Sequence, residues 1–355
     1  MRVAGVMSGT SLDGIDVAIV EIRGAQIRTV GFHSTPYPES TRSALLGELD
    51  AARLSRLNFQ LGELYARAVW KAVRRFGPVS LIGCHGQTVF HEGGANTLQI
   101  GEASVIAEVM GVPVVSNFRA RDIAAGGEGA PLVPYVDFRL FRHPRRTRIA
   151  LNIGGIANIT HIPPGASAKD VIAFDTGPGN MVIDALAREY TGGRQNYDRG
   201  GRIAASGSVR RELLDDLLRD PYYRRRPPKS AGREQYGAEF VERLKRTKFP
   251  LPDLISTATV LTAATIAAAI RRSVKGPAEV IVSGGGVHNP QIMGHLAAFL
   301  PTASIASSAA YGIDPDGKEA VAFAVLAYET WRRRPANLPS ATGARRTVIL
   351  GAITP

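Results

Sequence analysis

The sequence predicts an α/β protein built from two halves of similar construction. Segments typical of strands and of helices alternate along the 355 residues, which is the pattern of α/β folds. A strand, a glycine-flanked polar turn and a second strand occur at residues 3–22 and again at residues 149–160. At roughly 100–200 residues per domain, the length also fits two domains. We therefore expect two α/β halves, each of which opens with a β-hairpin.

The elements of the first half follow from simple patterns. Residues 3–6 and 16–22 are apolar strands that flank the polar turn of the first hairpin. Apolar residues then recur at helical spacing between residues 54 and 75, at Leu57, Leu61, Leu64, Ala68 and Ala72. Residues 80–84 are a short strand that ends at His85-Gly86-Gln87-Thr88.

The second half begins after Pro144–Thr147, which interrupts the pattern and is a candidate domain boundary. The expected elements are the hairpin at 149–160, a strand at 171–174, helices at 180–190 and 260–274, a strand at 279–282 and a helix at 319–331.

Composition and charge exclude several classes of protein. Hydrophobic residues make up 45% and charged residues 21%, which excludes a disordered chain, collagen and a coiled-coil rod. The formal net charge is +12, but the arginine runs at residues 224–226 and 332–334 contain no interleaved aromatic residues for base stacking. They predict a solvated surface or the attraction of an anionic substrate, and no binding of nucleic acid.

Nothing in the sequence predicts a membrane or an oxidising compartment. No apolar run approaches the roughly 18 residues of a membrane helix, and the N-terminus reaches Gly, Ser and Thr too soon for a signal peptide. The single cysteine, Cys84, cannot form an internal disulfide. We therefore expect a reduced cytoplasmic protein.

The tip of the first hairpin is the first candidate site, with the sequence Met-Ser-Gly-Thr-Ser-Leu-Asp-Gly-Ile-Asp at residues 7–16. Gly9 and Gly14 let the backbone approach a ligand, and the N–H groups of a turn can bind an anion. Asp13 and Asp16 can hold Mg²⁺ directly or through water. No Walker A motif is present. The alternative is an ordinary turn.

Asp175 marks the second candidate site, between an apolar strand and the loop Gly177-Pro178-Gly179. A carboxylate that faces a glycine loop at a helix N-terminus is well placed for chemistry on a phosphate-bearing substrate. The alternative is that Asp175 closes the loop through an Asx turn.

Two weaker candidates occur later in the chain. Gly284, Gly285 and Gly286 follow a buried strand and would let a flat ligand lie on the backbone. Glu319 begins a helix after an Asp-Pro-Asp-Gly turn. The alternatives are a plain strand-to-helix turn and a carboxylate that stabilises a helix N-terminus.

Polar donors suited to a sugar are concentrated at residues 97–102 and 117–132. An arginine of the second stretch would suit a sugar that carries a carboxylate. The alternative for both stretches is a surface loop. His85 and His91 lie in a glycine-broken loop, and no further Cys or His spacing supports a zinc site.

Taken together, these motifs resemble those of the anhydro-N-acetylmuramic acid kinases. The matching stretches are residues 7–14, 86–88, 99–102, 117–119, 126–132, 152–158, 174–180, 283–290 and 316–327. One mild departure is Ala231, where the family usually has Thr.

The resemblance implies the fold of sugar kinases, actin and the heat-shock chaperones. That fold has two actin-like (ribonuclease H-like) domains with mixed five-stranded sheets, which flank a central cleft that closes on ATP and substrate. We place the first domain, with the phosphate hairpin and the sugar contacts, at residues 1–146 and about 312–355. The second, at residues 147–311, holds the catalytic Asp loop and the adenosine side.

The resemblance also implies a reaction. ATP, Mg²⁺ and water act on 1,6-anhydro-N-acetylmuramic acid, open its anhydro ring and phosphorylate O6. The products are N-acetylmuramic acid 6-phosphate and ADP, in the recycling of cell-wall sugars in the bacterial cytoplasm. No nucleic acid or membrane is expected as a partner, and a homodimer is possible.

By the same resemblance, Asp175 is the base that deprotonates water and Glu319 assists it. The residues implied for the phosphates and Mg²⁺ are Gly9, Thr10, Ser11, Leu12, Asp13, Gly14, Ile15, Asp16, Gly154, Gly155 and Asn158. Those implied for adenosine are Gly284, Gly285 and Gly286. The implied sugar contacts are Gln87, Thr88, Gln99, Glu102 and either Arg119 or Arg121.

Two alternatives remain at this point. One is a non-catalytic actin-like or chaperone-like ATP switch, which would need neither a sugar pocket nor a base such as Asp175. The other is a conventional sugar kinase of the same fold, in which the base deprotonates a substrate hydroxyl and no ring is cleaved.

Overall fold

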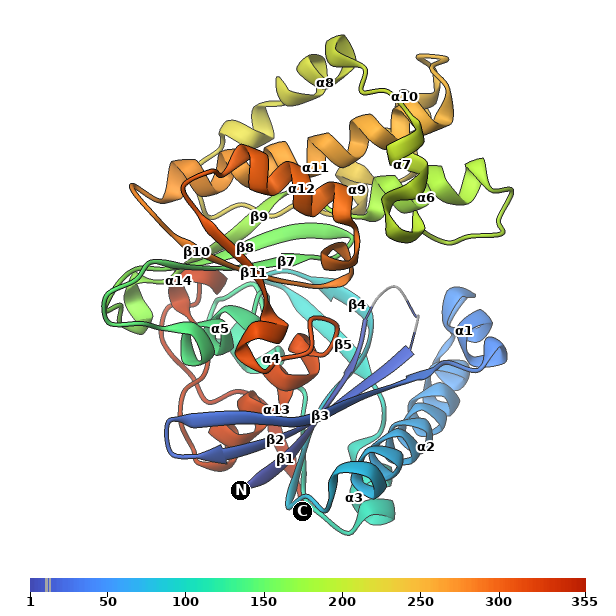
Figure 1. Ribbon diagram of the computed structural model, residues 1–355. Helices are drawn as coiled ribbons and strands as arrows, with labels where there is room; N and C mark the ends of the chain where they lie inside the picture. The colour runs from blue at the N-terminus through green and yellow to red at the C-terminus, as the bar shows by residue number, and fades with distance from the viewer. Residues whose placement is uncertain (10–11, 13) are drawn as a thin grey trace. The chain divides into compact units, whose positions relative to one another are not determined.

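A computed structural model describes residues 1–9, 12 and 14–355, which form two compact units (Figure 1). Unit 1 comprises Met1–Leu140 and Gly312–Pro355, and unit 2 comprises Phe141–Tyr311. The chain first passes from unit 1 to unit 2 after Leu140, slightly before the boundary expected at residue 146. The reason is local packing, because the ring of Phe141 contacts that of Tyr311, with centroids 5.8 Å apart.

Unit 1 is built on a mixed sheet with the strand order β12-β6-β4-β1-β2-β3, to which β5 is added beside β4. Strands β1 to β3 form an antiparallel meander, whereas β4 is parallel to both β1 and β6. The strands are β1 (Arg2–Ser8), β2 (Gly14–Arg23), β3 (Gln26–Pro36), β4 (Leu81–Glu92), β5 (Asn96–Ile100), β6 (Val114–Ser116) and β12 (Ala352–Thr354).

Unit 2 repeats this plan in a five-stranded sheet with the order β11-β10-β7-β8-β9. Its strands are β7 (Arg148–Ile153), β8 (Ile156–Ile162), β9 (Ile172–Pro178), β10 (Glu279–Ser283) and β11 (Ser304–Ser307). Strands β7 to β9 are again an antiparallel meander, and β10 is parallel to β7 and β11. The two mixed sheets confirm the predicted fold class. The sheet of unit 1 differs from the expected five strands by the additions β5 and β12.

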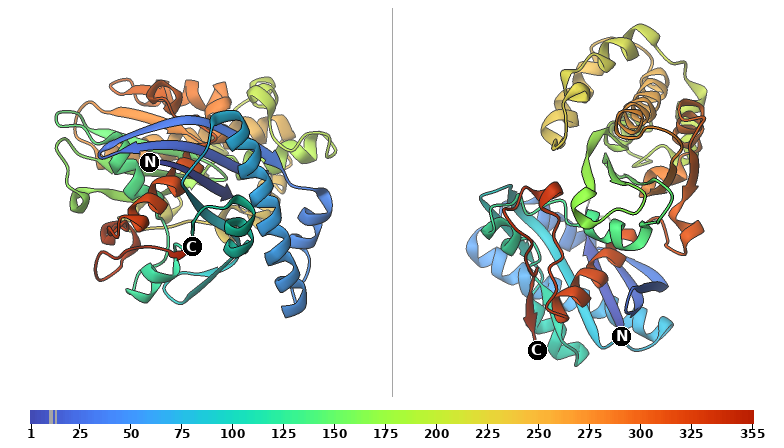
Figure 2. Two further views of the ribbon diagram at one scale, coloured as in Figure 1. Left: turned by 90° about the horizontal axis from the view of Figure 1, so that it is seen from below. Right: turned by 90° about the vertical axis from the view of Figure 1, so that its left-hand side faces the viewer.

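Helices α2 and α13 cover opposite faces of the unit 1 sheet (Figure 2). Ala4 and Val6 of β1 share a hydrophobic core with α2, whereas Gly5 faces α13. A methyl group on Gly5 would lie 1.9 Å from the carbonyl oxygen of Ala320, so glycine is required for this close packing. The helices are α1 (Glu39–Leu46), α2 (Ala51–Phe76), α3 (Ala103–Met110), α4 (Ala120–Ala124), α5 (Val133–Phe141), α13 (Lys318–Trp331) and α14 (Pro339–Thr342).

Helix α11 is the centre of the unit 2 core and packs on β8, β9, α6 and α12 (Figure 1). Among the described residues it is the one helix long and apolar enough to cross a membrane, but 89% of its apolar window is buried inside the protein. The α-helices are α6 (Met181–Tyr190), α7 (Arg202–Ser206), α8 (Arg211–Leu218), α9 (Arg233–Tyr236), α10 (Ala238–Lys245), α11 (Leu251–Ser273) and α12 (Pro290–Phe299). Short 3₁₀ segments are η1 (Ala168–Asp170), η2 (Arg199–Gly201), η3 (Pro221–Arg224), η4 (Gly285–His288) and η5 (Ser308–Tyr311).

Three predicted boundaries differ from the structure. The strand predicted at residues 80–84 continues to Glu92, so His85 and His91 lie in β4 and not in a loop. Asp175 lies inside β9, which runs on through Gly177 and Pro178, rather than at the end of a strand. Helix α11 begins at Leu251, before the expected start at residue 260.

Candidate active site

A row of polar side chains crosses four neighbouring strands of unit 2. The registers pair Ser283 of β10 with Asn152 of β7, Asn152 with Asn158 of β8, and Asn158 with Asp175 of β9. Side chains of directly paired residues lie on the same face of a sheet. Ser283 is the last residue of β10, and ligands of open α/β sheets commonly bind beyond the carboxyl ends of parallel strands.

Glycine turns lie beside this row. The carbonyl oxygen of Gly154 accepts a hydrogen bond from the N–H of Asn180 at 2.7 Å, and that of Gly155 accepts one from the N–H of Gly179 at 2.9 Å. A methyl group on Gly179 would lie 2.2 Å from the carbonyl oxygen of Gly154, so a side chain there would separate the two turns. A methyl group on Gly284 would lie 2.7 Å from Oδ1 of Asn152. The turn at residues 154–155 and the glycines at 284–286 are thus packed against neighbouring parts of unit 2.

Asp175 is held on three sides by the segment at residues 222–231. Its Oδ2 accepts a hydrogen bond from the N–H of Ala231 at 2.9 Å, and its carbonyl oxygen accepts one from the hydroxyl of Tyr222 at 2.8 Å. Its own N–H donates to the carbonyl oxygen of Lys229 at 3.2 Å. Oδ1 has no hydrogen-bond partner within the described parts of the chain, so it is available to a ligand.

Burial raises the pKa of Asp175 to about 6. The hydrogen bond from Ala231 and the charge of Lys229 act in the opposite direction. The Lys229 ammonium is buried, donates to the carbonyl oxygen of Tyr222 at 3.1 Å and lies 4.4 Å from the centre of the Tyr222 ring. A carboxylate whose pKa is near the working pH is suited to act as a general base.

In unit 1, the hairpin tip is described at Gly9, Leu12 and residues 14–16, whereas Thr10, Ser11 and Asp13 lie outside the described residues. The side chains of Leu12 and Ile15 belong to the hydrophobic core, so only their backbone groups can face a ligand. The carbonyl oxygen of Gly9 accepts a hydrogen bond from the N–H of Leu12 at 3.2 Å. Gly14 begins β2, and Asp16 lies partly buried in the same strand.

The structure brings together the side chains of two predicted sugar contacts, Thr88 and Gln99. Gln87 and Thr88 are neighbours in β4, and Thr88 pairs with Gln99 of β5. The amide of Gln99 donates to the hydroxyl of Thr88 at 3.2 Å. Glu102 is not part of this cluster, because its carboxylate caps α3 through the N–H of Ser104 at 3.0 Å and accepts from Asn58 at 2.9 Å.

The two candidate arginines differ in their surroundings. Arg121 is exposed on α4. Arg119 is partly buried and donates to Nε2 of His85 at 2.9 Å and to the carbonyl oxygen of Gly129 at 2.9 Å. Because Nε2 of His85 accepts, its proton lies on Nδ1 and is donated to the carbonyl oxygen of Gly86 at 2.8 Å. His85 is therefore a structural partner of Arg119.

Glu319 lies in the first turn of α13, in the same unit as Arg119. Burial raises the pKa of Glu319, against the charges of Lys318 and Arg119, which lower it. Lys318 is itself buried and pairs with Asp137 at 3.0 Å. Asp175 belongs to unit 2 and Glu319 to unit 1.

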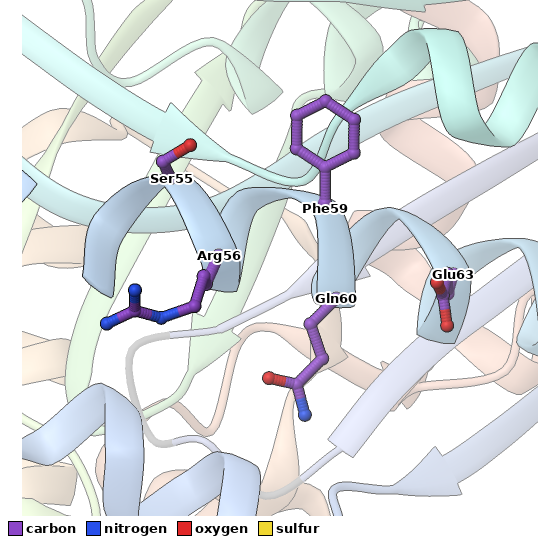
Figure 3. A pocket seen from close by; sticks show the side chains of 5 residues that line it. All are labelled: Ser55, Arg56, Phe59, Gln60 and Glu63. Carbon is purple, nitrogen blue, oxygen red and sulfur yellow. The ribbon is translucent and has the colours of Figure 1, made fainter. Parts of the chain in front are cut away.

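No cluster of three or more His, Cys, Asp or Glu side chains occurs among the residues that the structure describes. The carboxylate oxygens of Asp16 are ligands of the kind that Mg²⁺ prefers. A shallow hollow on the outer side of α2 is lined by Ser55, Arg56, Phe59, Gln60 and Glu63 (Figure 3). It contains none of the predicted site residues.

Comparison with known proteins decides the family. The family model described as anhydro-N-acetylmuramic acid kinase matches residues 1–355. Relatives of that name are 45% identical in Thiobacillus denitrificans and 40% identical in Caldanaerobacter subterraneus, each over 99% of this chain and 96% of the relative. A third, from Bacillus cereus strain AH187, is 42% identical over 100% of this chain and 99% of the relative.

The chain belongs to the anhydro-N-acetylmuramic acid kinase family. It is therefore a phosphotransferase. Among solved structures, the activator of the 2-hydroxyisocaproyl-CoA dehydratase from Clostridium difficile with bound ADPNP is similar, with 11% identity, a TM-score of 0.48 and coverage of 94% of this chain and 96% of that one.

The sequence alone did not reveal the residues of this kinase that hold Asp175 and Arg119. Tyr222, Lys229 and Ala231 contact Asp175 from a segment far along the chain, and no spacing pattern connects them to it. The departure at Ala231 is the one signal that pointed to this segment. His85 lies in β4, and its Nε2 accepts a hydrogen bond from Arg119, so it supports that arginine.

Proposed function

We propose that this kinase uses ATP and water to convert 1,6-anhydro-N-acetylmuramic acid into N-acetylmuramic acid 6-phosphate and ADP. Asp175 accepts a proton from water, whose oxygen forms a bond to C1 of the sugar while the bond from C1 to O6 breaks. O6 then forms a bond to the γ-phosphorus, and ADP leaves. The first part resembles an inverting glycosidase, and the second is an ordinary phosphoryl transfer.

The observation that carries the proposal is the environment of Asp175. One oxygen is fixed by the N–H of Ala231 and the other has no partner within the described chain, so the carboxylate is oriented and still able to accept a proton. Its raised pKa, about 6, makes it a better proton acceptor than an exposed aspartate while it stays largely ionised at neutral pH. A pure nucleotide switch does not need such a group.

For the phosphates of ATP, we propose the hairpin tip at residues 9–16 and the turn around Gly154, Gly155 and Asn158. Gly284–Gly286 would line the adenosine. Asp13 and Asp16 would hold Mg²⁺, which would neutralise charge on the phosphates. Backbone N–H groups of the tip would then bind the phosphate oxygens, since the side chains of Leu12 and Ile15 are in the core.

For the sugar, we propose Gln87, Thr88 and Gln99 as hydrogen-bonding contacts, because the side chains of Thr88 and Gln99 are hydrogen-bonded to each other and Gln87 directly precedes Thr88 in β4. Glu319 would assist the base. An arginine would meet the lactyl carboxylate, and Arg121 has the more accessible guanidinium, since Arg119 already donates to His85 and Gly129. We further propose a cytoplasmic role in the recycling of cell-wall sugars, with no nucleic acid or membrane as a partner.

The mass of the product tests the proposal. The purified protein is incubated with ATP, Mg²⁺ and the anhydro sugar, and the sugar products are analysed by mass spectrometry. Ring opening adds both a phosphoryl group and the atoms of one water molecule to the sugar. A conventional sugar kinase would add the phosphoryl group alone, and an ATP switch would release ADP and leave the sugar unchanged.

A further inference from the structure

A chain of four buried side chains leads from the core of unit 1 to the predicted sugar contacts. The hydroxyls of Tyr65 and Tyr37 lie 3.1 Å apart, and that of Tyr37 lies 2.5 Å from the hydroxyl of Ser8. Ser8 in turn donates to Oε1 of Gln87. Every member is at most 8% exposed. The side chains come from α2, from the residue directly after β3, from β1 and from β4, so the chain connects elements that are distant in the sequence.

A backbone carbonyl fixes the direction of the whole chain. The amide nitrogen Nε2 of Gln87 lies 3.3 Å from the carbonyl oxygen of Thr88, which can only accept. Oε1 of Gln87 therefore faces Ser8, and the single hydroxyl proton of Ser8 must be donated to it. Ser8 then accepts from Tyr37, and Tyr37 accepts from Tyr65. Both tyrosines can donate at any physiological pH, because burial raises the pKa of Tyr37 to about 12 and that of Tyr65 well above its ordinary value.

We propose that Tyr65, Tyr37 and Ser8 are positioning residues that hold the amide of Gln87 so that its N–H group, and not its oxygen, is presented to the sugar. This rests on the proposed function of Gln87 as a sugar contact. In the reversed orientation, the oxygen of Gln87 would face the carbonyl oxygen of Thr88, which cannot donate. The hydroxyl proton of Ser8, which the hydrogen bond from Tyr37 helps to direct at Gln87, would lose its acceptor, so this orientation is disfavoured. One of the two N–H bonds of Gln87 has no partner in the described part of the chain and can serve a sugar oxygen.

The hydroxyl of Ser8 is thus fully engaged and does not act as a free ligand of phosphate, although Ser8 directly precedes the proposed phosphate hairpin. The positioning role and a phosphate role therefore predict different kinetics. Loss of the chain should weaken binding of the sugar and leave binding of ATP unchanged. Because KM does not depend on the amount of active enzyme, partial unfolding of a variant would lower its apparent kcat but would not imitate this pattern.

The test is a double-mutant cycle of Tyr37→Phe, Ser8→Ala and the combined variant, with KM measured separately for the sugar and for ATP. Removing one hydrogen bond of the chain should raise the KM for the sugar about three- to tenfold. In the double variant, the KM for the sugar should rise by clearly less than the product of the two single increases, because both substitutions act on the same chain of hydrogen bonds. Tyr197→Phe, at a tyrosine of unit 2 that is 51% exposed, is the matched control and should behave like the wild type.

An unchanged KM for the sugar, a rise confined to ATP, or independent effects of the two substitutions would overturn the positioning role. If Tyr37→Phe does not fold, Ser8→Ala alone carries the same comparison of the two KM values. Failure of the proposed function can be distinguished from failure of the positioning role, because the wild-type protein itself would then not turn over the sugar.

Discussion

At the scale of single residues, Asp175 is the group on which the proposed chemistry depends. Asp175→Asn keeps the shape of the side chain and an oxygen that can accept from Ala231, but it removes the base. Because a general base typically contributes about 10²–10⁴ in rate, we expect the variant to lose most of its turnover. Glu319→Gln should lose a smaller part of its turnover. The measurement is kcat, together with calorimetric affinities for ATP and for the sugar, which should stay close to the wild type.

Near wild-type kcat in Asp175→Asn would show that the base is elsewhere. A joint collapse of rate, binding and thermal stability would show instead that Asp175 mainly holds the loop at Gly177–Gly179, which is the structural alternative that the sequence left open.

The pH dependence of the reaction follows from the same residue. The base must be ionised, and burial raises the pKa of Asp175 to about 6, so kcat/KM should fall as the pH drops through about 6. An acid limb near the ordinary carboxyl value of 3.8 would contradict this assignment.

The raised pKa of Asp175 also makes the stability of the fold depend on pH. The folded protein binds the Asp175 proton more tightly than the unfolded chain, so this group destabilises the fold increasingly as the pH rises from about 4 to about 6. Asp175→Asn removes that effect, and its melting temperature at neutral pH should equal or exceed that of the wild type. A melting temperature clearly below that of the wild type would contradict this expectation.

At the scale of elements, the position of α13 depends on the absence of a side chain at Gly5. Gly5→Ala would place a methyl group 1.9 Å from the carbonyl oxygen of Ala320, the residue that follows Glu319. We expect a loss of about 1–3 kcal/mol or more of stability, together with reduced turnover, because α13 must shift on the sheet.

Gly294→Ala is the matched control, since nothing lies within 4 Å of the added methyl group and Gly294 is inside helix α12. It should stabilise the protein by about 0.5–1 kcal/mol. Chemical denaturation of both variants measures the difference. Equal stabilities for Gly5→Ala and the wild type would refute the close packing of α13.

The elements whose patterns depend on near neighbours in the sequence could be predicted. The five apolar positions at helical spacing correctly predict helix α2. The succession of an apolar strand, a polar turn and a second strand correctly predicts both hairpins. Helix α11 starts earlier than predicted because buried Thr257 and Thr259 donate their hydroxyl protons to the carbonyl oxygens of Asp253 and Ile255, which makes polar residues acceptable in the core. The strand β4 continues through Gly86 because glycine adopts a φ of +79° there.

The arrangement of the site depends on contacts that no local pattern contains. Asp175 was predicted as a base, but its hydrogen bond from Ala231 spans 56 residues of sequence. The row from Ser283 to Asp175 depends on strand order, because β10 lies beside β7 although more than a hundred residues separate them. Glu102 was predicted as a sugar contact from its motif, yet its carboxylate is engaged at the start of α3.

At the scale of the whole molecule, the positive charge is concentrated in unit 2. Residues 141–311 contain 24 Lys and Arg against 14 Asp and Glu, whereas the rest of the chain contains 19 against 17. ATP and the muramic acid are both anions, so we expect kcat/KM to fall when the salt concentration rises from about 0.05 M to about 0.3 M, while kcat changes little. Steady-state rates over this range, with sucrose at matched osmolarity as a control, test it. Values of kcat/KM that do not depend on salt would rule out electrostatic attraction.

The central claim is that water attacks the sugar and the sugar oxygen attacks the phosphate. The most direct measurement is turnover in ¹⁸O-water with mass spectrometry of the sugar phosphate, while the finished product incubated in the same water corrects for slow exchange at C1. We predict ¹⁸O at C1 of the sugar above that background and none in the phosphate. Label in the phosphate, or no label at C1 beyond the background, would contradict the account.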